Sequence, residues 1–154
     1  MARPETAMWD TALIGKEYAP FNAGVDAAQI AAFAASIGEN DPIYQDEAAA
    51  KAAGYPAIPA PLTFPFSLMM VAEQSFLVHA DLDIPIPKTV HGEQWFEFHN
   101  ALYAGDIVTG QQKIADMFEK KGGALQFIIT QTRMDNQDGV HICDLKTSIV
   151  VLNN

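Results

Sequence analysis

The feature that most constrains the fold is a series of alternating segments in the second half of the chain. The turn sequences between them include Lys-Lys-Gly-Gly at 120–123 and Asp-Gly at 138–139. Glycine-containing turns between runs of alternating bulky and polar side chains are typical of β-hairpins. We therefore predict three or four antiparallel strands, at residues 90–99, 106–118, 124–134 and 140–152.

The first half predicts helices. Asp26 can cap a helix, with Gln29 three residues later as in a capping box, and Gly38 ends that helix. Asp46 begins a second, alanine-rich helix that ends at Gly54. These two short helices precede the strand-rich half.

A third helical segment is predicted at residues 64–80. Pro65 lies in its first turn, where proline is tolerated, and its polar interruptions fall together at 73–75. His79 lies near its end, where a positive charge is favourable. A helix that is apolar on nearly all sides is usually enclosed by other structure.

One apolar helix and one antiparallel sheet make an α+β protein. The economical arrangement is a hot-dog fold, in which the sheet wraps around one long apolar helix. Periodicity alone would also permit a cystatin-like or ferredoxin-like sheet. We expect one domain over residues 1–154, with residues 1–13 as a flexible or loosely packed N-terminus.

Charge and composition exclude several functions. The chain of 154 residues has a formal charge of −10 and no basic run, so we expect no nucleic-acid partner. The uncharged stretch at 52–72 contains four prolines, which argues against a membrane-spanning helix. Residues 1–5 form no apolar signal segment, and we expect a cytoplasmic protein. The single cysteine, Cys143, is expected in the core.

The segment from Ser36 to Asp46, SIGENDPIYQD, resembles the signature of the MaoC-like hydratases and dehydratases, Gly-Asp-x-Asn-Pro-aliphatic-His before an alanine-rich helix. Further matches to the N-terminal-domain subfamily, the FAS1-like dehydratases, are AGY at 53–55, IPAP at 58–61, VHGEQ at 90–94 and AGD at 104–106. The resemblance spans roughly residues 14–152. It implies a hot-dog fold, an acyl thioester of coenzyme A or acyl carrier protein as substrate, and reversible hydration of a trans-2-enoyl chain, without metal or cofactor.

The implied reaction requires a base for water, a proton for the α-carbon and a donor for the enolate-like oxygen. This sequence departs from the family pattern at each of these points. The aspartate position carries Glu39, the histidine position carries Tyr44, and the glycine that presents the oxyanion N–H falls near Pro61, which has none. Ala60 or Leu62 would have to supply that donor.

The resemblance assigns further substrate-binding positions to Asn40, Asp41, His91 and Gly92. Asn40 and Asp41, with Glu39, also suit a structural turn before Pro42. His91 and His99 lie eight residues apart on one predicted strand and hence on one face, but their spacing matches no metal-binding motif.

We therefore predict an acyl-thioester-binding hot-dog subunit that is non-catalytic or weakly catalytic and pairs with a MaoC-like chain containing the Asp/His dyad. One alternative is a homodimeric enoyl-CoA hydratase or 3-hydroxyacyl dehydratase with Glu39 as base, completed by Tyr44 or His91. A second alternative is a small-ligand carrier. Because a bent sheet has exposed edges, we expect at least a dimer with the acyl cleft at its interface.

Overall fold

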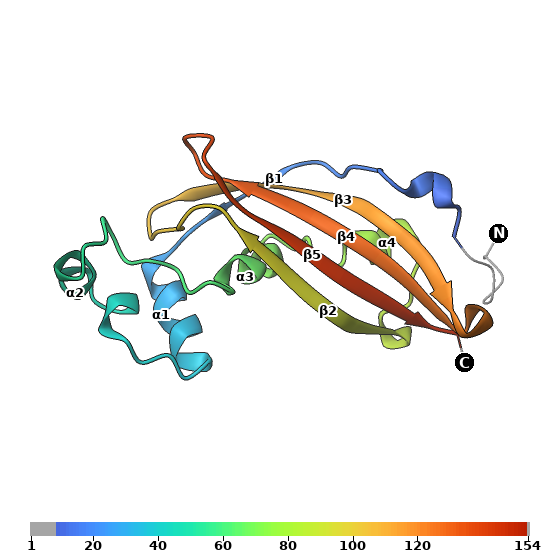
Figure 1. Cartoon of the computed structure of the whole chain (residues 1–154), viewed down its shortest axis with the longest axis horizontal. Helices are drawn as coiled ribbons and strands as arrows, with labels where there is room; N and C mark the ends of the chain where they lie inside the picture. Colours follow the sequence, from blue (N-terminus) through green and yellow to red (C-terminus); the bar gives the residue numbers. More distant parts are fainter. Residues whose placement is uncertain (1–8, 154) are drawn as a thin grey trace.

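The computed structural model describes residues 9–153 and contains one five-stranded antiparallel sheet (Figure 1). The strand order is β1-β3-β4-β5-β2, with β1 and β2 at the two edges. The four predicted strands are present with slightly shifted ends, and β1 is an additional strand. The strands are β1 (Phe21–Gly24), β2 (Thr89–Phe98), β3 (Ile107–Lys120), β4 (Leu125–Asp135) and β5 (His141–Leu152).

The helices lie in two groups. In Figure 1, α3 and α4 lie against one face of the sheet, whereas α1 and α2 gather beyond one of its ends. The helices are α1 (Ala27–Ser36), α2 (Glu47–Ala52), α3 (Phe64–Val71) and α4 (Leu77–Asp81), with 3-10 turns at Thr11–Leu13, Pro42–Tyr44, Ile86–Lys88 and Lys121–Gly123. This α+β arrangement confirms the predicted hot-dog fold class.

Side-chain caps define the starts of α1 and α2 as predicted. The Asp26 carboxylate accepts hydrogen bonds from the N–H groups of Ala28 and Gln29. The Asp46 carboxylate likewise accepts hydrogen bonds from the N–H groups of Ala48 and Ala49. An aspartate at the N-cap satisfies backbone donors that have no partner within the helix.

The prediction of one long helix at residues 64–80 was wrong. The Gln74 N–H donates to the Met69 carbonyl at 2.8 Å, and the Glu73 N–H donates to the Met70 carbonyl at 3.1 Å. These two bonds form a Schellman ending, with Glu73 in the left-handed region at φ 58°. Glycine normally marks this position. Because the residue here is glutamate, the sequence did not indicate the interruption between α3 and α4.

Two hydrophobic clusters join these helices to the sheet. In one, Phe64 and Leu68 of α3 pack with Leu145 of β5, and in the other, Val78 of α4 packs with sheet residues such as Ile128. The two halves of the interrupted helix therefore both lie against the sheet. Within the described residues, no helix is long and apolar enough to cross a membrane.

The expectation that residues 1–13 are flexible or loosely packed does not hold at residue 9. Trp9 is only 8% exposed and belongs to the α4 cluster, together with Tyr18. Residues 1–8 lie outside the part of the chain that the structure describes. Cys143, by contrast, is fully buried as predicted, and burial raises the pKa of its thiol to about 12.

Candidate functional site

The structure brings four of the predicted site residues to one small pocket of about 200 Å³, here called the proline pocket. These residues are Tyr44, Ala60, Pro61 and Leu62. The pocket lies between the proline-rich crossing that precedes α3 and the segment that follows β2. Its remaining lining residues are Tyr55, Pro59, Pro65, Phe98, Asn100, Ala101, Leu102 and Ile142.

Glu39, Asn40 and Asp41 do not line this pocket and instead hold the turn between α1 and α2. Glu39 Oε1 accepts a hydrogen bond from the Asp41 N–H at 3.0 Å. Asn40 Nδ2 donates to the Gly38 carbonyl at 3.2 Å, and Asp41 Oδ1 accepts from the Ile43 N–H at 3.1 Å. Each side chain therefore has a partner within the turn, and this accounts for asparagine and aspartate at these positions.

Tyr44 is half-buried and packs against the cluster formed by α1, α3 and the sheet. Burial raises the pKa of its hydroxyl above the usual value, and the charge of nearby Glu39 raises it further. A phenol with a raised pKa stays protonated at neutral pH and donates a hydrogen bond, whereas a general base must accept a proton. Tyr44 therefore cannot perform the proton transfer that the family assigns to histidine.

Of the three residues predicted near the oxyanion position, only one has a backbone N–H that is available to a ligand. Pro61 is buried and has no N–H, and the Ala60 N–H donates to the Leu102 carbonyl at 2.8 Å. Leu62 lines the pocket and is 67% exposed, and its N–H has no backbone partner among residues 9–153. Only Leu62 retains a free backbone donor in the expected place.

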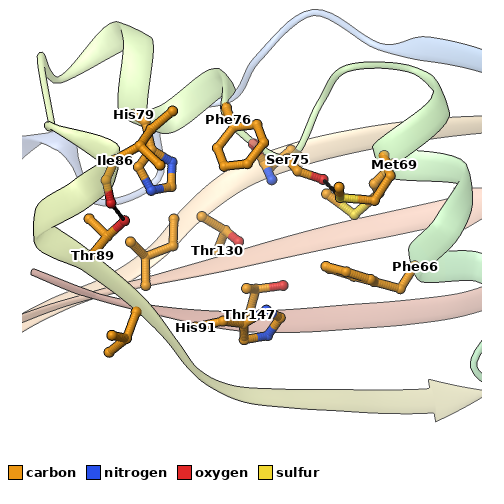
Figure 2. Close-up of a pocket in the computed structure, with 14 residues that line it drawn as sticks. Phe66, Met69, Ser75, Phe76, His79, Ile86, Thr89, His91, Thr130 and Thr147 are labelled. Atoms are coloured by element: carbon orange, nitrogen blue, oxygen red, sulfur yellow. Dashed lines mark hydrogen bonds between the residues drawn. The ribbon is translucent and has the colours of Figure 1, made fainter.

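A second, larger cavity lies between the interrupted helix and the sheet, and we call it the helix–sheet cavity (Figure 2). Its volume is about 350 Å³. Most of its wall is apolar, because α3 and the linker to α4 contribute phenylalanine and methionine side chains. It is lined by Phe66, Met69, Met70, Ser75, Phe76, His79, Ile86, Thr89, Val90, His91, Gln112, Thr130, Thr147 and Ile149.

Two buried polar atoms face this cavity without a hydrogen-bond partner within the described chain, His79 Nδ1 and Gln112 Oε1. His79 is 7% exposed, and burial lowers its pKa below the usual value. The neutral imidazole is thus favoured, contrary to the expectation of a cation at the helix end. The sequence did not indicate that these two side chains are buried at a cavity, because their burial depends on how α4 packs against β3.

His91 and Gly92 do not lie at the proline pocket. The His91 side chain lines the helix–sheet cavity (Figure 2). Its ring packs against the Phe66 ring, tilted by 54°, at 5.4 Å between centroids. A Cβ on Gly92 would lie 2.8 Å from Val150 Cγ2, so close contact between strands explains the glycine.

The expectation that His91 and His99 share a face was wrong. The register of β2 against β5 shifts between His91 and Glu93, which marks a bulge at Gly92. An extra residue in a strand reverses the side to which later side chains point. His91 accordingly faces the helices, whereas His99 contacts Asp144 on the other side of the sheet.

Comparison with known proteins agrees with this architecture. Residues 12–145 match the family model described as "FAS1-like, dehydratase domain region". A relative named UPF0336 protein from Saccharopolyspora erythraea is 32% identical over 142 residues, covering 92% of this chain and 90% of the relative.

Solved structures share the fold. A chain of the HadBC (3R-hydroxyacyl-ACP dehydratase) complex from Mycobacterium tuberculosis superposes with a TM-score of 0.76 at 27% identity, over 90% of this chain and 96% of that chain. A chain of the ChsH1-ChsH2 complex from the same organism superposes with a TM-score of 0.72 at 23% identity, over 89% and 84% of the two chains. The family match, the relative and the fold together show that this chain belongs to the FAS1-like dehydratase region family of MaoC-like hot-dog proteins.

Proposed function

We propose that this chain is an acyl-thioester-binding subunit of a hot-dog hydratase or dehydratase, with little or no turnover of its own. A second hot-dog chain with an Asp/His pair would supply the chemistry. The observation that carries the proposal is the contrast between the two cavities. Most of the wall of the helix–sheet cavity is apolar, and no carboxylate lines it beside His79 and His91, whereas no histidine within residues 9–153 lines the proline pocket.

The site residues support binding better than proton transfer. Glu39 is engaged by the Asp41 N–H, and Tyr44 is held in its protonated form. A Tyr44 hydroxyl and a Leu62 N–H can donate hydrogen bonds to a thioester carbonyl, but neither removes a proton from water. The proposal therefore assigns Tyr44, Ala60, Pro61 and Leu62 to substrate contact at the proline pocket.

The substrate class follows from the helix–sheet cavity and from the family. Phe66, Met69 and Met70 provide an apolar wall, and methionine side chains adapt to ligands of different shape. Such a cavity suits the acyl chain of a trans-2-enoyl or 3-hydroxyacyl thioester. His91 would lie beside this chain, and Gly92 would allow β2 to approach β5 closely.

The free edge of β2 supports a hot-dog partner. Its one neighbour in the sheet is β5, and three large apolar side chains along it are exposed, Val90 at 48%, Trp95 at 45% and Phe98 at 42%. Long edge strands with exposed apolar residues are usually covered in native proteins. The HadBC dehydratase is likewise a complex, and the proposal extends such an assembly to this chain.

The test compares the chain alone with the chain bound to a MaoC-like subunit that contains the Asp/His pair. Hydration of crotonyl and longer enoyl thioesters, on coenzyme A and on acyl carrier protein, is followed for both. We expect background rates for the chain alone and an active complex whose rate is unchanged by Glu39→Gln. Turnover by the chain alone at about 1 s⁻¹ or faster, lost in Glu39→Gln, would instead establish the homodimeric enzyme.

A second measurement tests the cavity. Ser75 lines the helix–sheet cavity, so Ser75→Trp should shorten the longest acyl chain that the complex accepts. Val71→Trp is the matched control, since Val71 is 62% exposed and does not line the cavity. An unchanged chain-length profile in Ser75→Trp would show that the acyl chain binds elsewhere.

A further inference from the structure

A group of histidine and carboxylate side chains lies where β2 ends and β5 begins, on the side of the sheet opposite α3. A β-bulge in β5 creates it. Met134 of β4 pairs with Cys143, but the next residue, Asp135, pairs with His141, so Ile142 is an extra residue. Ile142 and Cys143 are consecutive and both buried, as expected at such a bulge.

The bulge changes the direction of one histidine. In a regular strand, side chains three residues apart point to opposite sides of the sheet. Here His141 and Asp144 point to the same side, and His141 Nε2 lies 2.9 Å from Asp144 Oδ2. His99, just beyond β2, places its Nε2 at 3.2 Å from the same oxygen.

The three side chains converge in a compact group that we call the His–Asp–His cluster (His99, His141 and Asp144). One ligand atom from each residue lies within 4.8 Å of the others, and the two imidazole rings stack at 4.0 Å between centroids. Glu97 Oε1 is 3.9 Å from His99 Nε2 and offers a fourth donor.

This donor set matches a late first-row metal ion. Two imidazole nitrogens and one carboxylate oxygen suit Zn²⁺ or Co²⁺ better than Mg²⁺ or Ca²⁺, which prefer oxygen ligands. Bonds of about 2.0–2.1 Å in a tetrahedral site separate donor atoms by about 3.3 Å. The 2.9 and 3.2 Å distances to Asp144 Oδ2 are close to this value, and the two stacked imidazole rings would have to turn so that both nitrogens point at one ion.

The surroundings hold the cluster in place and leave it accessible. The His99 N–H donates to the Ile142 carbonyl at 2.9 Å, and Asn100 Nδ2 donates to the His141 carbonyl at 2.8 Å. The side chains of His99, His141 and Asp144 are 33%, 24% and 15% exposed, whereas His141 Nε2 itself is buried and has no hydrogen-bond partner within the described residues.

We propose that His99, His141 and Asp144 form a binding site for Zn²⁺ or a similar divalent transition-metal ion. The bound ion links the end of edge strand β2 to β5, and Phe98, Asn100 and Ile142 of the proline pocket are its immediate neighbours in sequence. The site thus has a structural role beside the substrate-binding region. This inference does not depend on whether the chain turns over substrate.

The test is a titration of the whole chain, without a histidine tag and stripped with chelator, with Zn²⁺ alone by calorimetry. Co²⁺ is added in parallel to record its visible absorption, which reports tetrahedral nitrogen and oxygen ligands. We expect one ion per chain and at least tenfold weaker binding in Asp144→Asn, His141→Gln and His99→Gln. His91→Gln is the matched control, because His91 is exposed and faces the other side of the sheet, and it should bind as tightly as the original chain.

Circular dichroism melts separate loss of the site from loss of the fold. His99→Gln changes a side chain beyond the end of β2, so the variant should remain folded even if substitutions within β5 do not. Absence of one-to-one Zn²⁺ binding at micromolar concentrations would refute the proposal. Binding that survives in folded His99→Gln and Asp144→Asn would also refute it and would leave the three side chains as a polar cluster without an ion.

Discussion

Strand β1 depends on one close contact that a single methyl group would break. Phe21 of β1 pairs directly with Gly110 of β3, and a Cβ built on Gly110 would lie 2.3 Å from Phe21 Cζ and 2.5 Å from Cε1. The Phe21 ring is only 7% exposed and belongs to the core beneath α3, so it cannot move away freely. Gly110→Ala should therefore force the ring out of its position.

The magnitude follows from two opposing effects. Overfilling a packed site costs about 1–3 kcal/mol, whereas alanine in place of a strand glycine otherwise stabilises by about 0.5–1 kcal/mol. We expect a net loss of about 1–2 kcal/mol for Gly110→Ala, which is a fall in Tm of about 2–8 °C for a chain of this size. In a Phe21→Ala background the steric effect disappears, and Gly110→Ala should become stabilising.

Urea unfolding of the two single variants, the double variant and the original chain measures this coupling. Gly24→Ala is the matched control, because Gly24 also lies in the β1–β3 ladder and an added Cβ meets nothing within 4 Å. It should be neutral or stabilising. Effects of Gly110→Ala and Phe21→Ala that add within about 0.5 kcal/mol would refute the reasoning, since residues in contact should not behave independently.

Three further predictions follow from backbone strain, burial and pKa. Glu73→Gly should stabilise the chain by about 1 kcal/mol in urea unfolding, because glycine adopts the left-handed conformation without cost, whereas Glu119→Gly in β3 should destabilise it. Burial lowers the pKa of His79 in the folded protein, so the unfolded chain binds the proton more tightly. The contribution of His79 to the free energy of unfolding should therefore be retained above about pH 6.5 and lost as the pH drops below that value. Over the same decrease in pH, the urea midpoint of His79→Gln should fall less than that of the original chain. A fall of equal size in both proteins would contradict this origin. Cys143 should resist a thiol reagent until the protein is denatured, since its thiol is fully buried and its pKa is raised to about 12, and rapid labelling of the folded chain would count against the assigned core.

Local signals predicted much of the fold. The caps at Asp26 and Asp46 and the turns at 120–123 and 136–140 act through neighbouring residues, so they can be recognised in a sequence. Strand β1 escaped prediction because an alternation over only four residues is too short to indicate a strand, and the strand depends on pairing with a distant one. The Schellman ending at Glu73 escaped it because the residue that usually marks such an ending is missing.

The candidate site divides in the same way. The motif around Glu39 and Tyr44, and the departure of both residues from the family pattern, could be recognised in the sequence, and the structure places Tyr44 at the proline pocket. Which backbone N–H groups at the proline pocket are already hydrogen-bonded within the chain could not be predicted. That the Ala60 N–H is taken by the Leu102 carbonyl follows only from the contact between two segments about forty residues apart.

The sequence by itself determined the succession of helices and strands, the family signature and the residues that replace its catalytic pair, because these depend on residue type and short-range spacing. The tertiary structure alone decided the direction in which key side chains point. One bulge at Gly92 separates His91 from His99, and another at Ile142 turns His141 toward Asp144. A single inserted residue reverses the alternation of a strand, and whether it is inserted depends on hydrogen bonding to the neighbouring strand rather than on the local sequence.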